Sequence, residues 1–214
     1  MKFAFNASGA NAPLIRDYDI ATSTAIKDGE AVGIADNKVV AAESGDHVLG
    51  VAAEEHTGKH DELNARADGG KIRVNIAPQA IYEASLPCFT ATGGSATTLV
   101  IPSSGVSTSL TSGRAVLVSK ADSSANTDKV GTLRRISACA VSGSSATLTL
   151  ASGGVPESGD VYRLIPDIGD EMYLDASGCG VCFFRTGATI KLICAYSDEE
   201  RGVVGVKLKA PVLA

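Results

Sequence analysis

The cysteines have the spacing most suggestive of chemistry. Cys179 and Cys182 form a C-x-x-C pair, and Cys194 follows in the next apolar run. With a histidine, these thiols could complete the four nitrogen and sulfur ligands of a zinc site. However, the chain has no second C-x-x-C, and the pair leads directly into Phe183-Phe184. A redox motif would need a βαβ context, which this sequence lacks. We therefore expect buried thiols that hold no metal.

Cysteine number and the N-terminal segment bear on the redox compartment. The chain has 5 cysteines, an odd number, and Phe3-Ala4-Phe5 is too short an apolar run for a signal peptide. Disulfides persist mainly outside the cytosol. We expect free thiols in a reducing compartment.

The remaining candidate groups do not form a catalytic pattern. His56 and His60 stand four residues apart, a spacing that aligns side chains only on a helix, and Gly58 lies between them. No G-x-S-x-G nucleophile motif is present. The acidic run Asp198-Glu199-Glu200 lies in a predicted hairpin turn, where the carboxylates cannot face each other across a cleft. We predict no catalytic, cofactor-binding or metal-binding residues, and no enzymatic activity.

Composition argues against two classes of partner. The formal net charge is −5, whereas proteins that bind nucleic acid cluster Lys and Arg against the phosphates. No apolar run approaches the ~20 residues that span a bilayer. Trp is absent and aromatic residues make up only 5% of the chain, so an aromatic binding platform is not expected. We predict neither nucleic acid nor membrane as a partner.

Short β-strands dominate the first part of the chain. Residues 26–54 contain three apolar segments, separated by turn residues at Asp36-Asn37 and at 43–46. The opening Asp28-Gly29-Glu30 has later echoes at Gly159-Asp160 and Gly169-Asp170, each of which precedes an apolar run. This pattern predicts an all-β chain that forms a small β-barrel.

A change in composition indicates a second β-unit. Residues 86–165 are rich in Ser and Thr, and strand-like runs recur there at 96–101, 114–119, 132–137, 146–151 and 160–165. The opening style resumes at Pro166. We predict an N-terminal arm (1–25), a discontinuous barrel (26–85 and 166–214) and an inserted β-domain (86–165). A disordered Ser/Thr-rich linker is the alternative for 86–165.

The arm has apolar residues without a regular period. They are set among Asn, Ser, Gly and Pro, and one interpretation is a terminus whose apolar side chains pack against the barrel. The other is an extended arm that contacts a partner by strand addition. The candidate contact residues are Phe3, Phe5, Leu14, Ile15 and Tyr18.

Three stretches resemble the capsid decoration, or cement, proteins of tailed bacteriophages. The first is 26–54, with Asp36-Asn37, Val39-Val40-Ala41-Ala42 and Leu49-Gly50-Val51-Ala52. The second is the alternating segment 71–84. The third, 97–166, resembles a β-module of phage virion proteins in which a strand-forming stretch ends in Gly-Asp and an apolar strand.

The resemblance implies a virion structural protein without catalytic residues or cofactors. It would be made in the host cytoplasm and bind the outer surface of the assembled head, with the major capsid protein as its partner. Members of the family are often trimers, so a homotrimer is expected. The inserted unit is larger than a minimal cement protein needs. The alternative is therefore a head-fibre or tail component, or an adhesion module whose insert binds a receptor or glycan.

Overall fold

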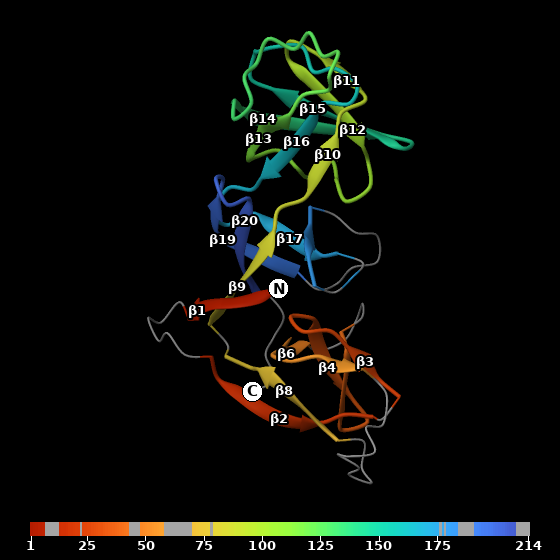
Figure 1. Cartoon of the computed structure of the whole chain (residues 1–214), viewed down its shortest axis with the longest axis vertical. Coiled ribbons are helices and arrows are strands. Elements are labelled where there is room, and N and C mark those ends of the chain that lie inside the picture. Colours follow the sequence, from red (N-terminus) through yellow and green to blue (C-terminus); the bar gives the residue numbers. More distant parts are fainter. Residues whose placement is uncertain are drawn as a thin grey trace.

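A computed structural model describes residues 1–6, 13–21, 23–42, 48–57, 70–77, 79–175, 177, 179–183 and 191–208, with the side chains of Phe5 and Asn6 left out. These residues form antiparallel β-sheets and no helix, as the sequence predicts for an all-β chain. No closed barrel is formed by the described strands. The seven-stranded sheet lies at one end of the molecule, the six-stranded sheet in the middle and the five-stranded sheet at the other end (Figure 1).

The six-stranded sheet joins the two ends of the sequence. Its order is β1-β9-β20-β19-β17-β18. These strands are β1 (Lys2–Asn6), β9 (Ala80–Ser85), β20 (Val203–Leu208), β19 (Lys191–Asp198), β17 (Glu171–Leu174) and β18 (Val181–Cys182). The predicted hairpin at Asp198-Glu199-Glu200 is confirmed, because Asp198 pairs with Val203 across the turn.

The five-stranded sheet contains the predicted opening meander. Its order is β2-β8-β6-β4-β5, with β2 (Ile15–Asp19), β8 (Lys71–Asn75), β6 (Val48–Ala52), β4 (Ala31–Ala35) and β5 (Lys38–Ala41). Asp36 and Asn37 connect β4 to β5 with φ of 48° and 59°, as the favoured two-residue hairpin turn requires. A small two-stranded sheet, β3 (Ala25–Ile26) and β7 (His56–Thr57), packs beside it. The second expected turn, at 43–46, lies outside the described residues.

The seven-stranded sheet consists only of strands from the predicted insert. Its order is β10-β16-β13-β14-β15-β12-β11. These are β10 (Cys88–Thr90), β16 (Val161–Ile165), β13 (Arg114–Ser119), β14 (Leu133–Ser142), β15 (Ser145–Leu150), β12 (Thr98–Pro102) and β11 (Gly93–Ser95). The Ser/Thr-rich segment is therefore folded rather than a linker. Its independence as a domain stays a prediction.

One type of turn occurs once in each large sheet, at residues 27–30, 157–160 and 167–170. The acidic last residue accepts a hydrogen bond on its side chain from the first residue's N–H, at 2.8, 3.2 and 2.8 Å. The glycine before it has φ of 78°, 94° or 95°, a conformation that glycine adopts without strain. The glycine and the acid together pair their backbones with Ala52, Ala91 or Cys194. The sequence echo is thus a recurring turn that starts a strand.

Apolar side chains form two cores. The main core spans the six- and seven-stranded sheets and includes Ala31, Val48 and Val51 of the five-stranded sheet. The small core lies on the other face of the five-stranded sheet and contains Ile20, Ile26, Val32, Val39, Leu49, Ala52, Ile72 and Val74. Because the main core continues from one sheet to the next, the sheets stabilise each other.

Asp160 connects the recurring turn to a buried polar cluster. Its carboxylate accepts hydrogen bonds from the N–H groups of Ala121 (3.1 Å) and Glu157 (3.2 Å) and from Nδ2 of Asn126 (2.9 Å). Burial alone would raise the pKa of Asp160, but these hydrogen bonds and one from Ser124 outweigh it and leave the pKa lowered. The carboxylate therefore stays charged inside the fold.

We predict that Asp160→Ala lowers the free energy of unfolding by about 3–5 kcal/mol, because it leaves several buried donors without an acceptor. Urea denaturation measures this. Asp122→Ala, at an exposed acid in the neighbouring loop, is the control and should change stability by about 0.5 kcal/mol or less. An equal effect of the two substitutions would contradict the role given to Asp160.

Candidate interaction surfaces

The two strands of the predicted arm are outermost in their sheets. β1 pairs with β9 on one side only, and β2 pairs with β8 on one side only. The expectation that this segment has few hydrogen-bond partners within the chain is therefore wrong for these strands. Each still has a second edge, and an outermost strand is a template for pairing with another chain.

The register of β2 shows which of its residues face outward. The O of Leu14 accepts a hydrogen bond from the N–H of Ile76 at 2.9 Å, and the N–H of Ile20 donates to the O of Gly70 at 3.3 Å. Because pairing in an antiparallel ladder alternates, Ile15 and Asp17 direct their backbone N–H and C=O groups away from β8. An isolated parallel bridge links Ile20 to Val39 of β5. The open part of this edge therefore lies at 15–17.

The predicted contact residues divide into two groups. Phe3 packs edge-on against Tyr82, with ring centroids 6.4 Å apart, and Tyr18 is half-buried against the small core. Leu14 and Ile15 are 46% and 41% exposed. Phe5 belongs to β1, and its side chain lies outside the described residues. Leu14 and Ile15 are the residues whose side chains remain available to a partner.

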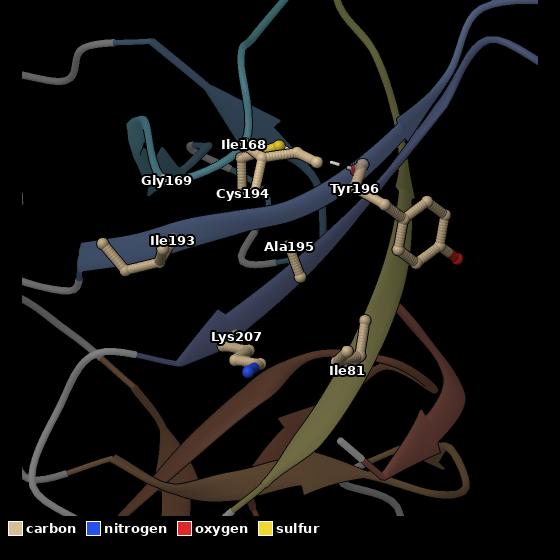
Figure 2. Close-up of a pocket in the computed structure, with 8 residues that line it drawn as sticks. All are labelled: Ile81, Ile168, Gly169, Ile193, Cys194, Ala195, Tyr196 and Lys207. Carbon is tan, nitrogen blue, oxygen red and sulfur yellow. Dashed lines mark hydrogen bonds between the residues drawn. The ribbon is translucent and has the colours of Figure 1, made fainter. Parts of the chain in front are cut away.

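A second surface is an apolar groove on the six-stranded sheet. Its volume is about 630 Å³. Ile81, Ile193, Ala195 and Lys207 lie along it on the neighbouring strands β9, β19 and β20, and Ile168 borders it (Figure 2). Ile168 is 76% exposed, although large apolar side chains usually bury most of their surface. The groove has the character of a contact surface.

A charged cluster adjoins this groove. Both oxygens of Glu83 accept hydrogen bonds from Arg201, at 2.8 Å each, and Oε1 also accepts one from the Tyr196 hydroxyl at 2.5 Å. The Tyr196 ring lies against Gly205, where any Cβ would overlap it. The Arg201 and Tyr196 hydrogen bonds lower the pKa of Glu83 from its usual value of 4.5. The cluster fixes the hydroxyl end of the Tyr196 ring at one end of the groove.

The cysteines and histidines do not gather into a site. All five cysteines are free, with Cys139 and Cys194 buried. Burial raises the pKa of Cys194 to about 12, so this thiol is protonated at neutral pH. Among the residues that the structure describes, no three His, Cys, Asp or Glu side chains are arranged to hold a metal ion. His60, half of the His56–His60 pair, lies outside the described residues, as does His47.

The comparisons with known proteins add no identity: no family model, no curated protein and no solved structure matches the chain. In the described part of the chain no helix has the length and apolar character to cross a membrane. Evidence about the site therefore comes from the geometry of this chain.

Sequence reasoning missed the groove. Ile193 and Ala195 read as ordinary strand residues, and the strand period cannot tell which face of a sheet stays open. Exposed Ile168 stands in the Asp167-Ile168-Gly169-Asp170 turn. A large apolar residue inside a predicted turn was the one available signal.

We predict that Gly205→Ala lowers the free energy of unfolding by about 1–3 kcal/mol, because the new methyl group displaces the Tyr196 ring. The same substitution in a Tyr196→Ala background should cost much less, since the ring is gone. Denaturant titration of the four proteins of this cycle measures the coupling. Equal costs in the two backgrounds would show that the ring is not what excludes a side chain at Gly205.

The lowered pKa of Glu83 predicts a pH dependence of stability. A carboxyl whose pKa is lowered on folding contributes stability above its unfolded pKa and loses it as the pH falls through the folded value. Glu83→Gln should therefore lose less stability than the parent protein on acidification below about pH 4.5. Thermal unfolding across this range tests it, with Glu200→Gln, at an exposed turn residue, as the control. Parallel pH profiles for the parent and Glu83→Gln would contradict the prediction.

Proposed function

We propose that the protein is a capsid decoration protein, which binds the outer surface of an assembled phage head through the open edge of β2. The observation that carries the proposal is the outward backbone of Ile15 and Asp17 beside the exposed side chains of Leu14 and Ile15. An open strand edge supplies hydrogen bonds to a partner strand, and the apolar side chains supply buried area. This is an interaction surface rather than a catalytic one.

The energetics suit binding to an assembly. Burying Leu14 and Ile15 is worth roughly 1.5–3 kcal/mol each before ordering costs. Such a contact is weak alone, but a surface composed of neighbouring capsid subunits exists only after assembly. A ligand that binds only the assembled state stabilises that state. The net charge of −5 also disfavours binding to packaged DNA.

The arrangement of the sheets supports a direction of attachment. The arm strands lie toward the end of the molecule with the five-stranded sheet, and the seven-stranded sheet lies at the opposite end (Figure 1). A protein attached through β2 would present the insert away from the head. In this proposal the five-stranded sheet is the wall of a small barrel, and the Ile20–Val39 bridge brings its two outer strands together.

The oligomeric state and the alternative role belong to the same proposal. A homotrimer follows from the family resemblance, and light scattering of the purified protein measures it. A head-fibre or tail role would use the same edge, with the projecting insert as the receptor-binding part. Copy number separates the two: hundreds per particle mean decoration, and a handful mean a fibre.

We predict that Asp17→Pro weakens binding to assembled heads about tenfold or more, equivalent to about 1.4 kcal/mol. Proline removes the outward N–H, while an edge strand tolerates it in the fold. The measurement is co-sedimentation with empty heads made of the cognate capsid protein. Asp17→Ala, which removes the charge and keeps the N–H, should bind as the parent protein does.

Two results would overturn this mechanism. One is equal sedimentation of Asp17→Pro and the parent protein, provided that their thermal unfolding midpoints agree. The other is binding to unassembled capsid subunits as tight as binding to heads, since decoration requires a surface that only assembly creates.

A further inference from the structure

A cavity of about 220 Å³ lies between the six-stranded and five-stranded sheets, beside both arm strands. Phe3 and Tyr82, paired on β1 and β9, line it from the six-stranded sheet. Ile15, Asn75 and Val51 line it from the five-stranded sheet, where they are direct neighbours on β2, β8 and β6. A water molecule occupies about 30 Å³ of liquid, so the cavity has room for a side chain.

Asn75 is an unusual residue for such a place. It is 2% exposed, and its Oδ1 accepts a hydrogen bond from the N–H of Ala77 at 3.1 Å. This bond fixes the orientation of the amide. Nδ2 is buried and has no hydrogen-bond partner within the described part of the chain. An unpaired buried donor costs about 1–3 kcal/mol, so an acceptor at this position would be stabilising.

The surroundings specify what kind of acceptor fits. The walls formed by Phe3, Ile15 and Val51 are apolar and suit a short hydrocarbon stem. Lys2 and Asp28 also line the cavity, and their opposite charges offset each other. A neutral carbonyl costs less to desolvate than a carboxylate and pairs equally well with an N–H donor. The cavity therefore matches an amide group at the tip of a flexible side chain.

We propose that this cavity receives the side-chain amide of a glutamine from a partner strand, with its carbonyl oxygen accepting from Nδ2 of Asn75. The proposal rests on the function proposed above, in which a partner strand pairs with the open edge of β2. Directly opposed residues on neighbouring strands share a face. The partner residue opposite Ile15 would thus lie on the cavity side of the sheet, and its identity would determine which partner fits.

The chemistry can be tested without the partner. In the ¹⁵N-labelled protein, propionamide and butan-2-one carry the proposed carbonyl, and propionate carries a charged one. We expect a saturable shift of the Asn75 side-chain NH₂ signal with both neutral probes. Propionate should bind about threefold or more weakly, because its charge must be desolvated. The exposed Asn37 and the buried, hydrogen-bonded Asn126 are internal controls that should not move.

Two variants connect the signal to the cavity. Asn75→Asp keeps an oxygen for the Ala77 N–H but removes the donor, so it identifies the NH₂ signal by its loss. Ala53→Leu fills the cavity, which Ala53 lines, and should abolish the shift while the Asn75 signal remains. Ala35→Leu, at an exposed position on β4, is the matched control and should leave the shift unchanged.

The outcomes separate this proposal from head binding. The absence of a saturable shift, an equal shift at Asn37, or a shift that persists in Ala53→Leu would mean that the cavity holds solvent only. Co-sedimentation supplies the second arm, in which Ala53→Leu should weaken head binding about tenfold and Ala35→Leu should not. If Asp17→Pro weakens head binding and Ala53→Leu does not, decoration stands and the glutamine pocket is overturned.

Discussion

The recurring turn at 27–30, 157–160 and 167–170 is the contact on which each large sheet depends. Its acidic side chain closes the turn on a backbone N–H, and its glycine and acid pair with a residue of another strand. A short strand gains little from its own ladder, so a turn that starts strand and pairing together stabilises more than a flexible loop. The third turn does more, because Asp170 also accepts from Ser112, and Asp167 from Gly113, both in the insert.

These contacts explain how an all-β chain with little aromatic content holds three sheets together. The main core passes from one sheet to the next, and polar contacts at its margin set their relative positions. Arg114 forms an ion pair with Glu199, and Arg163 donates to the Glu199 carbonyl at 3.3 Å. The price of this stability is borne by the outer strands β1 and β2, which complete their sheets while leaving one edge without a partner. The proposed function uses that edge.

Local patterns in the sequence predicted the strands well. β13 and β20 have the expected bounds, because alternating apolar residues end at clear turn signals. Asp36-Asn37 predicted its hairpin because few residue types accept positive φ. Pairing over long distances was not predictable: nothing in Lys2–Asn6 shows that it adds to β9. Leu14 and Ile15 were identified from their type, whereas Asn75 was missed, because an unpaired amide depends on distant neighbours and leaves no local pattern.

The insert is attached through a stem of two adjacent strands, and this has a mechanical consequence. β10 enters the insert and β16 leaves it, and the two pair side by side from Cys88–Arg163 to Thr90–Val161. A pull on the far end of the insert therefore reaches the rest of the molecule through two neighbouring strand ends. Both ends load the same short ladder, so it opens one hydrogen bond at a time instead of resisting in shear. Tension on the insert would be expected to yield at this stem first, leaving the head-facing sheets in place.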